Sequence, residues 1–126
     1  MESPYKGKTG LQRIVRALIY SLDGLRTAFR HEAAFRQEAL LSCLLIPTAL
    51  LLPISIISKA LMVFSVLAVL IIELLNSAIE AAVDHTSLEQ HPLAKRAKDI
   101  GSAAVLLSLL NVVMVWLIIL SSQIEK

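Results

Sequence analysis

The chain has 126 residues, enough for a single domain (residues 1–126) and too few for two ordinary globular units. Hydrophobic residues make up 56% of it and gather in long runs, which excludes an ordinary soluble globular domain. The formal net charge of +2 says little by itself, because the distribution of charge matters more. We expect no nucleic acid partner.

A helical period of apolar side chains runs over residues 11–31. The apolar positions that form one stripe are Leu11, Ile14, Val15, Leu18, Leu22, Leu25 and Phe29. The arginines on the opposite side are Arg13, Arg16, Arg26 and Arg30. A basic amphipathic helix suits the surface of an anionic lipid leaflet, and the alternative is the solvated face of a soluble helix. We therefore expect an N-terminal amphipathic helix that lies on a membrane surface.

Three apolar stretches follow, each long enough to cross a bilayer. Residues 39–58 and residues 100–124 carry no charge, and residues 60–83 would give roughly 36 Å of helix against a hydrocarbon core of about 30 Å. Pro53 marks the far end of the first stretch, and Lys59 stands in a short connection to the second. The sequence predicts an all-α, polytopic membrane protein with transmembrane helices over these three ranges.

Lysine and arginine are distributed unevenly between the two ends of the predicted spans. Seven lie before the first span and three in the polar residues 84–99, against one each at Lys59 and Lys126. Cytoplasmic segments carry an excess of basic residues, so the N-terminus and the loop of residues 84–99 are predicted to be cytoplasmic. The N-terminal helix, residues 32–38, the acidic end of the second span and this loop would then meet at one membrane face.

The second span carries acids along one side. Five polar residues share one narrow face of a helix with 3.6 residues per turn. They are Glu73, Asn76, Ser77, Glu80 and Asp84. An ionised acid at bilayer depth costs roughly 2.5–3.5 kcal/mol on insertion scales, so such residues rarely lack a function. We therefore expect the functional site on this face, at the cytoplasmic boundary of the membrane.

These residue types support metal-assisted phosphoryl transfer. Glu32, Glu80 and Asp84 are candidate oxygen ligands for Mg²⁺, which binds through one or two carboxylates plus phosphate oxygens. Glu73 lies deeper, among apolar neighbours, and is a candidate general base for an alcohol presented from the lipid. The cations that would receive phosphates are Arg13, Arg16, Lys95, Arg96 and Lys98. Metal ligands, cations and a base beside hydrocarbon indicate phosphoryl transfer to a lipid.

The composition limits this interpretation. The chain has only four glycines, so neither a P-loop nor the glycine-rich loop of protein kinases is present, and a nucleotide site would be built differently. Three helices cannot enclose a polar seam alone, so we expect the acidic face to pack against another subunit. The residues alone leave three functions open: phosphoryl transfer, an ion- or substrate-translocating oligomer, and a structural polar interface.

Three segments carry a resemblance to a known family. They read ELLNSAIEAAVD at residues 73–84, EAAFRQE at residues 32–38 and AKDIGSAA at residues 97–104. Together they resemble the small bacterial integral-membrane diacylglycerol kinases, and the similarity runs from about Gly10 into the third predicted span.

The resemblance implies a homotrimer in the bacterial inner membrane, with one surface helix and three transmembrane helices per subunit and with composite sites between subunits. It implies that ATP, with Mg²⁺, phosphorylates 1,2-diacylglycerol to phosphatidic acid at the cytoplasmic face. This reaction recycles diacylglycerol in phospholipid metabolism. Diacylglycerol, ATP and membrane lipid are therefore the expected partners.

The same resemblance implies roles for individual residues. Glu73 would be the catalytic proton acceptor with Asn76 positioning it, and Glu32 and Glu80 would hold the metal. The nucleotide would contact Arg13, Tyr20, Glu32, Glu80, Glu89, Gln90, His91, Lys98 and Asp99. The lipid substrate would contact Arg13, Arg26, Ala34, Phe35, Arg36, Gln37, Glu38, Glu73 and Ser102.

Alternatives remain within and outside this family. An undecaprenol kinase of the same fold would phosphorylate a longer isoprenoid alcohol, although the intact FRQE segment at residues 35–38 favours diacylglycerol. A different class is a small oligomeric proton-coupled transporter in which Glu73 carries the proton. For single residues, Asp84 is expected to pair with a neighbouring subunit. Trp116 is equally suited to an interfacial anchor and to packing.

Overall fold

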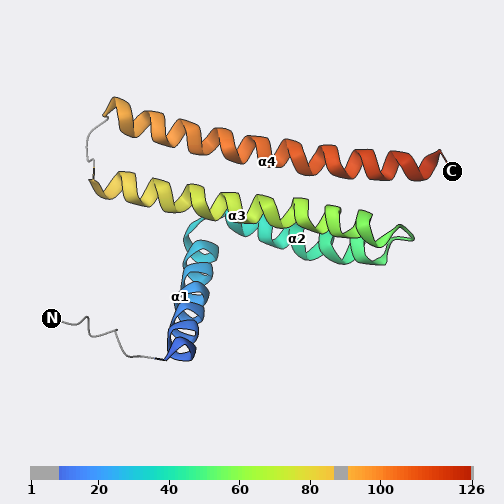
Figure 1. Ribbon diagram of the computed structural model, residues 1–126. Coiled ribbons are helices and arrows are strands. Elements are labelled where there is room, and N and C mark those ends of the chain that lie inside the picture. The colour runs from blue at the N-terminus through green and yellow to red at the C-terminus, as the bar shows by residue number, and fades with distance from the viewer. Residues whose placement is uncertain (1–8, 87–90, 126) are drawn as a thin grey trace.

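The computed structural model describes residues 9–86 and 91–125, which contain four helices and no strand. In chain order these are α1 (Gly10–His31), α2 (Ala33–Leu51), α3 (Ile56–Thr86) and α4 (Pro92–Ile124). Helices α2, α3 and α4 run alongside one another, and α1 projects away from them (Figure 1). The predicted all-α class is confirmed.

The three long helices are apolar on their outer surfaces. Each of α2, α3 and α4 is long and apolar enough, by length and composition, to cross a membrane. Large apolar side chains point outward from all three, among them Leu44, Phe64 and Leu107. A soluble domain would cover such side chains, so the outer surface of the bundle fits contact with lipid.

A single residue separates α1 from α2. Glu32 has an extended backbone (φ −109°, ψ 104°), and its N–H still donates to Ala28 O at 2.8 Å. The Arg36 guanidinium donates from Nη1 to Phe29 O at 2.8 Å and to Arg30 O at 3.2 Å. These carbonyls belong to the last turn of α1 and have no partner further along the helix. Arg36 therefore caps α1 and helps to fix the corner between α1 and α2.

The connection between α2 and α3 differs from the one that the sequence predicted. The first span was expected to run to residue 58 and the second to begin at residue 60, whereas α2 ends at Leu51 and α3 begins at Ile56. Pro53 disfavours the helical conformation of the residue before it, and Leu52 is extended (φ −67°, ψ 145°). Lys59 therefore belongs to the first turn of α3, where its ammonium donates to Leu50 O at 2.7 Å.

The predicted loop of residues 84–99 is also shorter in the structure. Helix α3 continues to Thr86, and α4 already begins at Pro92. The His91 side chain accepts a hydrogen bond from Leu93 N–H at 3.1 Å and so caps the helix. Pro92 is suited to the first helical position, because the N–H that proline lacks would have no partner there. Lys98 and Asp99 consequently stand on the first turns of a helix rather than in a loop.

Helix α3 lies between α2 and α4 and packs against both. The apolar core is at one end of the bundle, where Ala49, Met62 and Ile119 are buried together. The Trp116 indole packs there and donates from Nε1 to Met62 O at 3.3 Å. Of the two roles open to Trp116, the structure shows packing. The acidic part of α3 lies toward the opposite end, beside the start of α4 (Figure 1).

Candidate functional site

Two of the polar residues predicted to share a face of α3 are buried within a single chain. Glu73 is 6% exposed and Asn76 is 8% exposed. Glu80 is half-buried and Asp84 is exposed. The deeper half of the acidic face is therefore covered by helices of the same chain, and the outer half is open. A single chain therefore covers more of this polar face than the sequence predicted.

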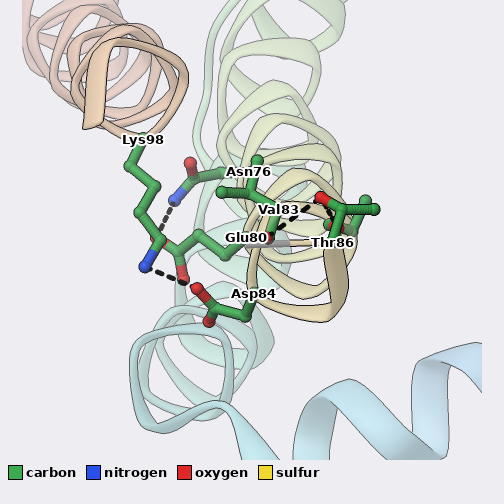
Figure 2. Close-up of polar contacts among 7 residues, drawn as sticks. Asn76, Glu80, Val83, Asp84, Thr86 and Lys98 are labelled. Atoms are coloured by element: carbon green, nitrogen blue, oxygen red, sulfur yellow. Dashed lines mark hydrogen bonds and ion pairs between the residues drawn. The ribbon is translucent and has the colours of Figure 1, made fainter. Parts of the chain in front are cut away.

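Asn76 and Glu80 contact each other along this face. Asn76 Nδ2 donates to Glu80 Oε1 at 3.2 Å (Figure 2). The two residues are four apart, which places them one above the other on a helix. The other end of the amide, Asn76 Oδ1, is buried and has no hydrogen-bond partner among the described residues. Asn76 thus restrains the carboxylate that was predicted to bind metal.

Helix α4 approaches α3 closely at a position that has no side chain. Gly101 is buried, and an added Cβ atom at this position would overlap with Asn76 Oδ1. Gly101 therefore faces the site itself, and the sequence did not predict this relation.

An ion pair joins the ends of α3 and α4 that lie nearest the site. Lys98 Nζ donates to Asp84 Oδ1 at 2.6 Å (Figure 2). Asp84 was expected to pair with a neighbouring subunit, and its partner in the structure is in its own chain. The ion pair within the chain was not predicted, because the sequence placed Lys98 in a loop, whereas α4 holds Lys98 beside the last turns of α3. A contact of Asp84 with a neighbouring subunit stays a prediction.

Further carboxylates lie around Glu73. Glu80 and Glu32 are its charged neighbours. Glu38, from α2, is another, and Glu38 Oε2 is buried without a hydrogen-bond partner among the described residues. These acids come from α3, from α2 and from the corner before α2. The fold therefore gathers acidic groups that are distant in the sequence.

The described acids do not form a complete metal site within one chain. Among residues 9–86 and 91–125, no three His, Cys, Asp or Glu side chains are grouped closely enough to hold a metal ion. Glu32, Glu80 and Asp84 do not meet around one point within a single chain. Mg²⁺ commonly takes only one or two carboxylates and fills its other positions with phosphate and water oxygens, so the pair Glu32 and Glu80 remains compatible with it.

A groove runs between α1 and α3 beside this cluster. Its volume is about 620 Å³ and its lining is mainly apolar. Its polar lining residues are Ser21, Thr27, His31, Glu32 and Ser77. Of these, only Glu32 was predicted as a site residue. Ser77 had been assigned to the acidic face without a role, and the residues from α1 gave no signal, because the corner at Glu32 decides which side of α1 meets α3.

The predicted nucleotide residues are only partly brought together. Arg13 and Tyr20 lie on exposed α1, while Lys98 and Asp99 lie on α4, and no hydrogen bond joins the two pairs within the described residues. Asp99 Oδ2 accepts from Lys95 at 2.6 Å. The His91 side chain caps α4, and the predicted residues Glu89 and Gln90 lie outside the described residues.

The predicted lipid residues have varied surroundings. Phe35 is 5% exposed and packs inside the chain, and Arg36 binds the carbonyls at the end of α1. Arg26 pairs with Asp23 at 3.5 Å on exposed α1. The other exposed or half-buried members of the set are Arg13, Ala34, Gln37, Glu38 and Ser102. Phe35 and Arg36 therefore have structural contacts that the sequence alone did not predict.

The chain is similar to known proteins over nearly its whole length. The family model for prokaryotic diacylglycerol kinase matches residues 19–120. The diacylglycerol kinase of Pseudomonas aeruginosa is 57% identical over 118 residues, which cover 94% of this chain and 96% of that protein. The diacylglycerol kinase of Escherichia coli strain K12 is 48% identical over 115 residues, 91% of this chain and 94% of that protein. That of Haemophilus influenzae is 48% identical over 108 residues, 86% and 92% respectively.

Proposed function

The chain belongs to the prokaryotic diacylglycerol kinase family, and from this premise we propose that it transfers the γ-phosphoryl group of ATP to the free hydroxyl of 1,2-diacylglycerol. The product is phosphatidic acid. Membership of a kinase family favours this reaction over a proton-coupled transporter. The single structural observation that supports it best is the buried carboxyl group of Glu73, beside Asn76 and among further acids, on a helix with a lipid-compatible surface.

Glu73 is the proposed general base. The oxygen of the lipid hydroxyl attacks the γ-phosphorus, the bond from that phosphorus to the bridging oxygen of ADP breaks, and the hydroxyl proton passes to the Glu73 carboxylate. Burial supports this role, because a base that accepts a proton from a membrane lipid must lie at the depth of that lipid. Asn76, one turn away, would keep the neighbouring Glu80 carboxylate in place.

Glu32 and Glu80 are the proposed ligands of Mg²⁺. When bound, this ion supplies neutralisation of the charge on the ATP phosphates. The pairing of Glu80 with the Asn76 amide supports a fixed position for one of the two carboxylates. Lys98 is the proposed phosphate ligand from α4, with Arg13 and Tyr20 completing the nucleotide site. The separation of α1 from α4 within one chain supports a site that is completed by a second subunit.

We further propose a homotrimer in the bacterial inner membrane. The N-terminus and the connection between α3 and α4 are cytoplasmic, as the excess of basic residues there supports. Helix α1 lies on the membrane surface, which is supported by its exposed apolar side chains, among them Leu11, Ile14 and Leu18. In this arrangement ATP reaches the acidic end of α3 from the cytoplasm and the lipid reaches it from the bilayer.

The decisive experiment measures transfer of the ATP γ-phosphate to a lipid in mixed micelles. We expect transfer to diacylglycerol by the wild-type protein. Glu73→Gln should abolish transfer while the thermal unfolding midpoint and the oligomer size remain those of the wild type. A Glu73→Gln variant that retains wild-type transfer would remove Glu73 from the proposed chemistry.

Parallel arms distinguish the substrate and the class. Undecaprenol in place of diacylglycerol tests the isoprenoid alcohol kinase, and preferential transfer to it would replace the proposed substrate. No transfer to either lipid, together with a proton flux in liposomes that Glu73→Gln abolishes, would indicate the transporter instead.

A further inference from the structure

Gly101 of α4 stands directly against the Asn76 amide of α3. An added Cβ atom at position 101 would overlap with Asn76 Oδ1 and lie 3.3 Å from Asn76 Cγ. Both residues are buried, so the amide has little free space around it. A Cβ atom added to Gly24, also inside a helix, would meet nothing within 4 Å. The close approach is therefore found at Gly101 and not at Gly24.

The orientation of this amide decides what Glu80 contacts. Asn76 Nδ2 donates to Glu80 Oε1, while Asn76 Oδ1 points to Gly101 and has no hydrogen-bond partner among the described residues. The two ends of a planar amide move together, so an amide that turns away from position 101 also withdraws its NH₂ group from Glu80. The atoms that a side chain at position 101 would meet both belong to the Asn76 amide, so the amide is the group that must shift, and its shift breaks the contact with Glu80.

We propose that Gly101 is a positioning residue for the metal site. The absence of a side chain there keeps the Asn76 amide turned toward Glu80, and the amide holds the Glu80 carboxylate where it binds Mg²⁺ with ATP. This inference rests on the proposed function, in which Glu80 is a metal ligand. Gly101 itself touches neither substrate nor metal and acts through Asn76 and Glu80.

Close helix packing alone also favours glycine, and the two explanations make different predictions. A packing role predicts that a larger residue lowers stability and leaves the Mg²⁺ requirement of the folded enzyme unchanged. The positioning role predicts a changed Mg²⁺ requirement with little loss of stability, because the overlapping atom is the end of a rotatable side chain. Alanine also favours a helix more than glycine does, so helix propensity cannot account for a loss in Gly101→Ala.

The first test titrates Mg²⁺ against transfer to diacylglycerol by the full-length enzyme in mixed micelles. Gly101→Ala should raise the Mg²⁺ concentration for half-maximal rate by about fivefold, the factor that one lost hydrogen bond represents. The KM for diacylglycerol should stay at the wild-type value. Gly24→Ala is the matched control and should leave the Mg²⁺ titration unchanged. A wild-type titration for Gly101→Ala overturns the inference.

The second test compares thermal unfolding midpoints. Asn76→Ala removes the atom that a Cβ at position 101 would meet. Adding Gly101→Ala to Asn76→Ala should therefore not lower the midpoint further, and a further fall overturns the proposed contact. If Gly101→Ala alone does not fold, the double variant decides: restored folding supports the contact with Asn76, and an unfolded double variant overturns it.

The inference and the proposed function fail in different ways. A wild-type enzyme that transfers no phosphate to diacylglycerol overturns the proposed function and, with it, the role of Gly101 in metal binding. A wild-type enzyme with normal transfer, together with an unchanged Mg²⁺ titration in Gly101→Ala, overturns the inference alone.

Discussion

The Lys98 ammonium donates to Asp84 Oδ1 at 2.6 Å and so ties the start of α4 to the end of α3 (Figure 2). Lys98 is the cation that we propose as a phosphate ligand. In the structure its ammonium is paired with Asp84 and not with a phosphate. Both side chains are substantially exposed, 42% for Lys98 and 63% for Asp84, which makes the pair easy to separate.

Asp84→Asn should therefore strengthen nucleotide binding. Loss of the carboxylate leaves the Lys98 ammonium available to phosphate, and we expect the KM for ATP to fall by about two- to fivefold, the range that an exposed ion pair represents. The stability should change by less than about 1 kcal/mol for the same reason. The measurement is transfer rate against ATP concentration in mixed micelles.

Asp23→Asn is the matched control for this prediction. It removes a carboxylate from another exposed ion pair, that with Arg26 on α1, and should leave the KM for ATP unchanged. A KM that rises in Asp84→Asn would mean that Asp84 supports nucleotide binding instead of competing with it.

Glu80→Gln should raise the Mg²⁺ requirement. The amide cannot replace the charge that a carboxylate gives to a metal ion, and we expect the Mg²⁺ concentration for half-maximal rate to rise by about tenfold or more. Glu125→Gln, at the far end of α4, is the control and should titrate like the wild type. Identical curves for Glu80→Gln and the wild type would remove Glu80 from the metal site.

Arg36→Lys should loosen the corner between α1 and α2. The guanidinium donates to the two carbonyls that end α1, and a lysine ammonium lacks the planar geometry that serves both. We expect amide hydrogen exchange at Glu32 to accelerate by about fivefold, which corresponds to one lost hydrogen bond. Arg16→Lys, on the exposed part of α1, should leave this rate unchanged. Equal rates in both variants would show that Arg36 does not fix the corner.

Trp116→Phe should lower stability without changing activity. The substitution removes the Nε1–H that donates to Met62 O, and interhelical hydrogen bonds in membranes contribute about 0.6–2 kcal/mol. The core around Met62 lies at the end of the bundle opposite the site, so kcat and both KM values should remain those of the wild type. The measurement is the unfolding free energy in detergent beside the transfer assay. A large fall in kcat would contradict this separation of core and site.

The sequence by itself determined the class of the protein and the face that carries its acids. Long apolar runs can only be helices in a bilayer, and the spacing of Glu73, Asn76 and Glu80 places them on one side of any helix, whatever packs against it. The family motifs likewise depend only on residue order. These features survive any error in where a helix begins or ends.

Only the tertiary structure decided which groups meet. The ends of α2 and α4 depend on local contacts, such as the conformation of Leu52 before Pro53 and the cap from His91, and hydropathy cannot detect these. The pairing of Lys98 with Asp84 and the fit of Gly101 against Asn76 depend on how α4 lies along α3. Periodicity gives the direction of a side chain about its own helix axis, whereas the neighbour that it meets is set by the rotation and depth of a second helix.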